Sequence, residues 1–288
     1  MAFLDPIPKM KNCIFCDSLI TKSNQSKEHV IPKWILDKLE PGYTYNNTGK
    51  WTTFPTNPEV IFSERKYSSY STVLGGVCKK CNGGWMSDLE TQFQSLFNAL
   101  YDEESPVIFT KEQSFIFAKW AFKTSITLNY SANYKKIIPI EHIHFFYRNK
   151  DMPPNMKVDI AFCEKEGLHQ LIGGNKLSII PDSYKNGKEL IEKSYIATFQ
   201  FDHLLIRVSW TPDPRLQVLN ISSNTVYRVH PLEDKDILIQ YVKDEVFKDI
   251  SHFHFFSTII VEDSIVKHTP DFNKVIQNLQ NLRSENSF

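Results

Sequence analysis

The stretch Cys78-Lys79-Lys80-Cys81-Asn82-Gly83-Gly84-Trp85-Met86 decides how the first third of the chain is organised. Two residues separate its cysteines, a spacing that lets two thiolates reach one tetrahedral ion from a tight turn. An equivalent pair, Cys13-Ile14-Phe15-Cys16, lies upstream. The two pairs together offer four sulfur ligands, so the sequence predicts a structural Zn²⁺ site held by Cys13, Cys16, Cys78 and Cys81.

The segment between the two pairs, residues 17–77, is 61 residues long. Loop-closure entropy grows only slowly with length, so an insertion of this size is compatible with one shared site. The alternative is a set of buried or redox-active cysteines, but two unrelated pairs in a chain with only five cysteines would be an unusual coincidence. The fifth, Cys163, lies in the strand-like VDIAFCE and is expected to be an ordinary buried residue.

The composition of the whole chain is that of a folded protein: 288 residues, 41% hydrophobic and 23% charged. This length is enough for two ordinary domains. The formal net charge is zero, and residues 1–100 carry 11 Lys and Arg against 9 Asp and Glu. A strong basic field is therefore excluded, and any contact with nucleic acid must use a local basic face.

The distribution of apolar residues predicts neither a membrane span nor a secretory signal. No stretch approaches the roughly 18 unbroken apolar residues that a membrane span requires. Residues 1–11 lack the apolar core of a secretory signal. We therefore expect a cytoplasmic protein without a membrane partner, and a reducing compartment would not maintain disulfides between these cysteines.

Turn-forming and polar residues dominate the first hundred positions. The polar, aromatic-containing insertion Pro41–Ser71 is typical of a hairpin or a long loop with a binding role. After it, Ser71–Val77 predicts a short strand that ends at two glycines.

Helical patterns follow. Ser87 and Glu90 have the spacing of a capping box, and they precede an apolar helix face made of Leu89, Phe93, Leu96, Phe97 and Leu100. A second helix is predicted from Thr110, with Gln113 as its capping partner, to about residue 130. A third covers Glu141–Arg148 and is stopped by the prolines at 153 and 154.

From residue 156 onward the pattern is that of strands. Short β-rich segments separated by turns predict a mostly antiparallel sheet from MKVDIAF, HQLIG, YIATFQF, LLIRVSW, RLQVLNI and TVYRV. A further helix is expected over Asp234–Lys248, followed by a strand at FFSTIIV. The fold class is thus α+β, with a zinc-stapled domain over residues 1–105 and an α+β recognition or regulatory domain over residues 106–288.

Between the cysteine pairs lies Lys27-Glu28-His29-Val30-Ile31-Pro32, and Asn82 directly follows the second pair. The order C-x-x-C, acid-His-aliphatic-aliphatic-Pro, C-x-x-C-Asn resembles the zinc-containing branch of the HNH endonucleases, whose site is a ββα-metal finger. The resemblance covers about residues 13–100 and says nothing about the rest of the chain.

The resemblance implies that His29 is the general base, that Glu28 and Asn82 help to hold one Mg²⁺ or Mn²⁺ ion, and that the cysteines hold a separate structural zinc. The chemistry is consistent with these roles. An imidazole titrates near neutral pH and can activate a water molecule. Carboxylate and amide oxygens suit Mg²⁺ or Mn²⁺, which absorbs charge at the scissile phosphate.

Each of these residues also has a plainer interpretation. Taken alone, Glu28 and His29 would be a solvent-facing polar pair ahead of a helix over Pro32–Leu39, and Asn82 would be a turn or capping residue. Their place between and beside two cysteine pairs favours the catalytic interpretation. The family's asparagine shortly before the second pair is missing here, so either Ser71 or Thr72 takes its hydrogen-bonding role or the loop is held otherwise.

Basic side chains near these motifs are candidates for the phosphate path: Lys27, Lys33, Arg65, Lys66, Lys79 and Lys80. Tyr43, Tyr45 and Trp51 are candidate groove contacts, and the alternative for the whole set is a solvated surface. We expect a nucleic-acid partner, DNA in preference to RNA. Because one such site cuts one strand, a double-strand break would need two sites, as a homodimer would supply.

Two further functional interpretations follow from the pattern. Analogy with stand-alone HNH proteins suggests restriction or phage defence as a role. The competing class is a non-catalytic zinc-ribbon adaptor that binds nucleic acid or protein, in which His29 would be replaceable. Two H-x-H pairs, at residues 142 and 144 and at residues 252 and 254, are assigned to no metal site.

Overall fold

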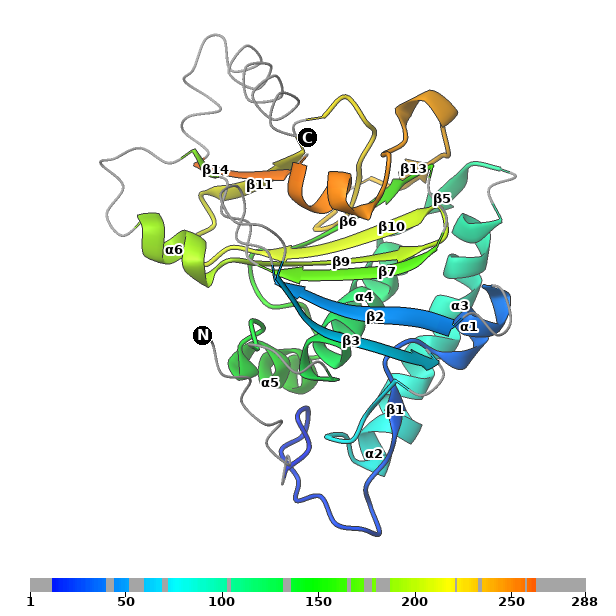
Figure 1. The fold of residues 1–288 in the computed structure, drawn as a ribbon, viewed down its shortest axis with the longest axis vertical. Coiled ribbons are helices and arrows are strands. Elements are labelled where there is room, and N and C mark those ends of the chain that lie inside the picture. The colour runs from blue at the N-terminus through cyan, green and yellow to red at the C-terminus, as the bar shows by residue number, and fades with distance from the viewer. Residues whose placement is uncertain are drawn as a thin grey trace. The chain divides into compact units, whose positions relative to one another are not determined.

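The computed structural model of the 288-residue chain is drawn in Figure 1. It describes residues 12–39, 44–51, 60–68, 72–102, 105–131, 136–164, 167–173, 178–179, 187–220, 222–232, 235–256 and 258–262. For residues 44–51, 60–68, 178–179, 188, 255–256 and 258–259 the description covers the backbone alone.

Contacts between residues divide the chain into two units. The first contains Met1–Gln92 and Lys123–Asp151, and the second contains Phe93–Phe122 and Met152–Phe288. Two helices, α3 (Ser87–Tyr101) and α4 (Lys111–Ser131), contribute residues to both. Each unit is therefore discontinuous in sequence, and a domain division near residue 105 stays a prediction.

The first unit is built from short strands and helices. Besides parts of α3 and α4 it contains β1 (Glu28–His29), α1 (Lys33–Lys38), β2 (Thr44–Trp51), β3 (Val60–Ser68), β4 (Val73–Leu74), α2 (Lys79–Cys81), the π-helical turn η2 (Asn82–Met86) and α5 (Ile140–Asn149). Strands β2 and β3 pair antiparallel, which confirms the predicted hairpin. Strands β1 and β4 also pair antiparallel, and the predicted short strand is present as β4.

Helix α3 begins at Ser87, but Ser87 is not its N-cap. Elements α2 and η2 precede it, and Ser87 itself has helical backbone angles, with its N–H directed to the carbonyls of residues 82 and 84. A kink at Gly84, with φ −110° and ψ −117°, separates the two helical stretches. The predicted capping box is therefore wrong, because the chain is already helical before Ser87. Glu90 instead forms an ion pair with Lys123.

The other two predicted helices are confirmed as α4 and α5. At the start of α4, the Thr110 N–H donates to Gln113 Oε1 at 2.9 Å, and the Gln113 N–H donates to Thr110 Oγ1 at 3.2 Å. This is the reciprocal capping box that the sequence predicts. Among the helices that the structure describes, none combines the length and the apolar character needed to cross a bilayer.

The second unit is centred on a five-stranded antiparallel sheet in the order β12-β6-β10-β9-β7 (Figure 1). The unit's remaining strands form two smaller sheets, β11-β14-β8 and β13-β5. Its elements are β5 (Val107–Phe109), β6 (Met156–Phe162), β7 (Leu168–Gly173), β8 (Ser178–Ile179), α6 (Gly187–Lys193), β9 (Tyr195–Phe201), β10 (Leu204–Trp210), β11 (Leu216–Asn220), β12 (Tyr227–His230), β13 (Ile237–Ile239), η3 (Lys243–Glu245), η4 (His252–Phe256) and β14 (Thr258–Glu262).

Both faces of the central strands are covered, which explains why β9 and β10 are almost continuously apolar. On one face, Phe201 packs against Phe97 and Trp120, with ring centroids 5.6 and 6.1 Å apart. On the other face lie two apolar clusters, one around Phe253 and one around Leu216. Cys163 belongs to the first of these clusters and is 1% exposed, as expected for an ordinary buried cysteine.

The helix predicted over Asp234–Lys248 is wrong. The described part of this segment contains strand β13, paired antiparallel with β5, and the single 3₁₀ turn η3. In β13, Ile239 is 1% exposed while Leu238 is 52% exposed, the alternation of a strand with one buried face. Pairing with a strand more than 120 residues upstream decides the conformation, and a local pattern cannot reveal such a partner.

Candidate functional site

The four cysteines of the two C-x-x-C pairs come together in the first unit. All their sulfur atoms lie within 4.8 Å of one another, and Cys16 Sγ is 3.6 Å from Cys78 Sγ. A tetrahedral site with metal–sulfur bonds of about 2.3 Å has sulfur–sulfur edges of about 3.8 Å. None of the four forms a disulfide. The cluster can therefore hold a structural metal ion such as zinc, and the four cysteines lie together as the sequence predicts.

Main-chain hydrogen bonds beside the cysteines hold the two pairs together across the insertion. The Ile14 N–H donates to the Gly76 carbonyl at 3.0 Å, and the Lys79 N–H donates to the Asn24 carbonyl at 2.7 Å. The Cys78 N–H is 3.4 Å from Cys13 Sγ, which it contacts as a donor. These bonds join the chain before the insertion Pro41–Ser71 to the chain after it, so the two cysteine pairs are held together at the base of the insertion.

The thiols perturb one another strongly. A hydrogen bond from Cys81 lowers the pKa of Cys13 to about 4, and the same contact raises the pKa of Cys81. Burial raises the pKa of Cys16. One thiolate thus forms readily, whereas four adjacent thiolates require a cation to offset their repulsion.

Aromatic residues join the cysteine pairs to α5. The Trp85 ring lies edge-on to Phe15 and to Phe146, with centroid distances of 5.2 and 5.6 Å. The Lys150 ammonium lies over the rings of Tyr147 and Trp85, at 4.0 and 5.4 Å. The cysteine cluster is therefore packed against a helix that lies more than 50 residues further along the chain.

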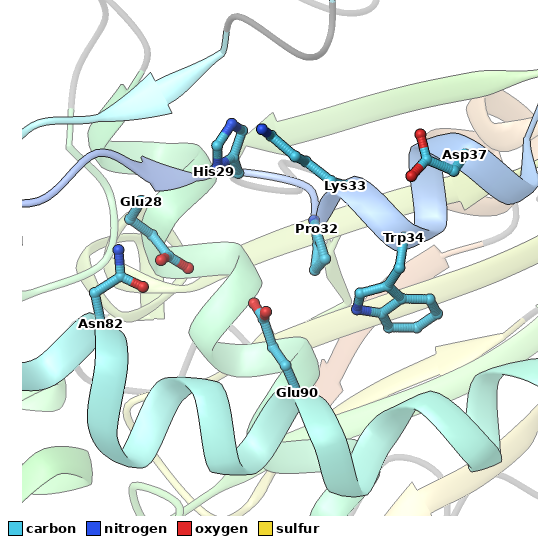
Figure 2. Close-up of a pocket in the computed structure, with 8 residues that line it drawn as sticks. All are labelled: Glu28, His29, Pro32, Lys33, Trp34, Asp37, Asn82 and Glu90. Atoms are coloured by element: carbon cyan, nitrogen blue, oxygen red, sulfur yellow. The ribbon is translucent and has the colours of Figure 1, made fainter. Parts of the chain in front are cut away.

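A polar pocket of about 430 Å³ lies in the same unit (Figure 2). It is lined by Glu28, His29, Pro32, Lys33, Trp34, Asp37, Asn82 and Glu90. The pocket brings together the three residues that the resemblance implies to be catalytic, Glu28, His29 and Asn82. They come from β1 and from the start of η2, segments more than 50 residues apart in sequence.

Main-chain bonds hold the strand that carries His29. Residue His29 is paired with Val73 across β1 and β4, and the Val30 N–H donates to the Thr72 carbonyl at 3.1 Å. The backbone of Thr72 therefore holds the chain directly after His29. Ser71, the other candidate for that role, lies outside the described residues.

Glu28 is almost fully buried and pairs with a lysine. Lys123 Nζ donates to Glu28 Oε1 at 3.0 Å and to Glu90 Oε1 at 2.7 Å. In Figure 2 the carboxylates of Glu28 and Glu90 point into the space between β1 and α3. Burial raises the pKa of Glu28, while Lys123 opposes that shift and Glu90 adds to it.

Lys123 itself is 0% exposed, and it is the residue of this site that the sequence analysis missed. Burial alone would lower its pKa, but the Glu28 and Glu90 carboxylates outweigh burial and raise it, so the ammonium stays charged. A signal was present in the sequence. Lys123 stands in the middle of FAKWAFKTSIT, a helix buried on every side, where an ammonium needs a carboxylate partner.

The oxygen donors of the pocket are of the type that binds Mg²⁺ or Mn²⁺. Glu28 offers a carboxylate and Asn82 an amide oxygen. Within the part of the chain that the structure describes, the cysteine cluster is the one group that brings together three or more His, Cys, Asp or Glu ligands.

The structure describes the side chains of some of the residues that are predicted to contact nucleic acid. Lys27, Lys33, Lys79 and Lys80 are exposed, and Lys33 lines the pocket. The side chains of Arg65 and Lys66, on β3, lie outside the described residues, as do Tyr43 and the side chains of Tyr45 and Trp51.

The strands and helix around the pocket follow the order β1, β4, α2–η2, with the β2–β3 hairpin inserted between the two strands. Comparison of the chain with protein families, with curated proteins and with solved structures gave no match. Function is therefore inferred from the geometry of the cysteine cluster and the pocket.

Proposed function

We propose that this protein is a metal-dependent HNH-type endonuclease that hydrolyses phosphodiester bonds of nucleic acid, DNA in preference to RNA. One observation supports it above the others. A strand–strand–helix arrangement beside a four-cysteine cluster brings Glu28, His29 and Asn82 to one polar pocket.

In this proposal His29 is the general base that accepts a proton from the attacking water, a task suited to a group that titrates near neutral pH. Glu28 and Asn82 contribute oxygen ligands on the pocket wall. A bound Mg²⁺ or Mn²⁺ supplies positive charge to the scissile phosphate and the leaving oxygen. The cysteines would hold a Zn²⁺ ion whose binding contributes to folding.

The surroundings of the pocket fit a phosphate-bearing substrate. Lys33 lines the pocket, and the exposed residues Lys79 and Lys80 precede Asn82 on a short helical turn. Together with Lys27, Arg65 and Lys66 they would contact backbone phosphates, which orient a duplex without reading its sequence. A homodimer would supply the second site for a double-strand break, with restriction or phage defence as the biological role.

Substitution of the base tests the proposal. His29→Ala should leave zinc content and melting temperature nearly unchanged, because the residue lies outside the cysteine cluster. Plasmid cleavage in Mg²⁺ or Mn²⁺ should fall by roughly two to four orders of magnitude, the usual contribution of a positioned general base. His169→Ala, on the exposed part of β7 in the second unit, is the matched control and should cleave as the wild type does.

Two other results would contradict the proposal. If His29→Ala cuts as fast as the wild type, His29 is not the base. If the wild type cuts neither DNA nor RNA in Mg²⁺ or Mn²⁺, the zinc-ribbon adaptor becomes the better description of the protein.

A further inference from the structure

Lys123 lies behind the pocket wall rather than in the pocket. The pocket is lined by both of its partners, Glu28 and Glu90, but not by Lys123 itself. The side chains of Lys123, Glu28 and Glu90 are 0%, 6% and 25% exposed, so the pairing is shielded from water on the lysine side and open toward the pocket. Lys123 therefore does not contact a substrate in this geometry.

The ammonium joins three separate elements. It is carried by α4 and bonds to Glu28 on β1 and to Glu90 on α3. Strand β1 has two residues, and its backbone is held by pairing with β4 and by the bond from the Val30 N–H to the Thr72 carbonyl. A bond at the Glu28 carboxylate fixes the residue directly before His29.

The charges of Lys123, Glu28 and Glu90 also favour holding β1, α3 and α4 in one arrangement. The ammonium bonds to both carboxylates, and without it negative charge on one carboxylate would be repelled by the other across the pocket wall. A buried ion pair is weak evidence for stability, because well-packed apolar residues often replace it without loss. Its better-supported use is to hold one specific arrangement of the surrounding elements.

We propose that Lys123 is a positioning residue of the endonuclease site: by bonding Glu28 and Glu90 together it fixes His29 relative to Asn82. This inference rests on the proposed function for its role in cleavage, but the placement of His29 can be measured without cleavage. The inference also gives Glu90 a place in this group with Lys123 and Glu28, instead of the helix-capping role that its spacing from Ser87 predicts.

The experiment compares Lys123→Met with Lys136→Met in the full-length protein. Lys136 is a matched control because it is a half-buried lysine of the same unit, bonded to the carbonyls of Asn129 and Tyr130 and not part of the pocket. Lys123→Met should lower the cleavage rate constant at saturating DNA by roughly 10- to 100-fold, the effect of misplacing a catalytic group by about 1 Å. The DNA dissociation constant should stay within about twofold of wild type, since Lys123 is not at the surface. Lys136→Met should change neither.

A second readout does not depend on activity. In protein with ¹³C-labelled histidine, the His29 ring signal is identified by its absence from His29→Ala. That signal should shift in Lys123→Met and stay in place in Lys136→Met. If Lys123→Met does not fold, Glu90→Gln replaces it, because Glu90 is partly exposed and the substitution removes the carboxylate charge from one of the two bonds to the ammonium.

The outcomes separate the two proposals. Unchanged cleavage and an unchanged His29 signal in a folded Lys123→Met or Glu90→Gln variant overturn the positioning role and leave the endonuclease proposal intact. A wild type that does not cleave overturns the endonuclease proposal, and the His29 signal alone then decides whether Lys123 positions His29.

Discussion

At the scale of single residues, Asp159 shows how the second unit tolerates charge inside its sheet. Its carboxylate is 0% exposed and accepts hydrogen bonds from Arg207 on β10, at 2.8 and 3.1 Å, and from Arg228 on β12. Burial opposes ionisation of Asp159, but Arg228 and Arg207 outweigh it and lower its pKa. The carboxylate is thus charged in the folded protein at neutral pH.

Asp159→Asn should therefore destabilise the protein by about 3–5 kcal/mol at pH 7, because it leaves buried arginine charge uncompensated. A carboxyl group whose pKa is lower when folded stabilises the protein above its unfolded pKa of about 3.9, and this contribution is lost as the pH falls toward the folded pKa. The difference between wild type and variant, measured by urea unfolding from pH 7 to pH 3, should narrow below about pH 4.

Asp213→Asn is the control for this measurement, because Asp213 pairs with the exposed Arg215. Loss of such a surface pair should cost no more than about 1 kcal/mol. Equal losses of stability in the two variants would show that the buried pairing of Asp159 contributes no more to stability than the surface pair of Asp213.

Spacing in the sequence was sufficient to predict the grouping of the four cysteines, and the resemblance to the HNH endonucleases selected Glu28, His29 and Asn82, which share the pocket. Residue identities could mark Lys123 as a lysine within an apolar helix but could not identify its partner Glu28, because an ion pair between residues 95 positions apart follows from packing alone. The prediction for Glu90 was wrong for a related reason. Its spacing from Ser87 fits a cap, but the helical turn before Ser87 removes the helix end that a cap would satisfy.

At the scale of elements, the cysteine cluster should behave as a structural metal site. Purified protein should contain about one zinc per chain, and Cys78→Ser should lose zinc and unfold at lower temperature, since zinc binding is part of the folding free energy in such units. Elemental analysis and thermal melting measure both effects.

Cys163→Ala is the matched control, because Cys163 is buried in an apolar cluster of the second unit. It should keep its zinc and lose only about 1–2 kcal/mol, as for an ordinary core substitution. Retention of zinc and an unchanged melting curve in Cys78→Ser would contradict a structural metal site.

The elements also show where local patterns were informative. The reciprocal bonds of Thr110 and Gln113 are local, and the start of α4 was predicted correctly. The apolar residues of Ile237–Ile239 were assigned to a helix, but their partner strand β5 is far away in the sequence. Short apolar segments of this kind fit either a helix or a strand until their tertiary partner is known.

At the scale of the whole molecule, a fragment of residues 1–105 tests the predicted domain division. It contains all four cysteines but lacks Lys123 and helix α5, which belong to the same unit as the cysteine cluster. We expect the fragment to bind zinc without forming a cooperatively folded site, as measured by circular dichroism and limited proteolysis. A fragment of residues 1–151, which contains both parts of the unit, should be more resistant to protease. A fragment 1–105 that folds and cleaves DNA would establish the predicted division and contradict a requirement for Lys123.

The separation of Glu28 from Lys123 along the chain also sets an order of events on the ribosome. Both cysteine pairs leave the exit tunnel before Lys123, because Cys81 precedes it by 42 residues. At about 5–20 residues per second, Lys123 emerges roughly 2–8 s later. A nascent chain can therefore close its sulfur ligands around zinc while Glu28 and Glu90 still lack their shared ammonium. On the proposed mechanism, newly made protein can bind its structural zinc before its cleavage site is complete.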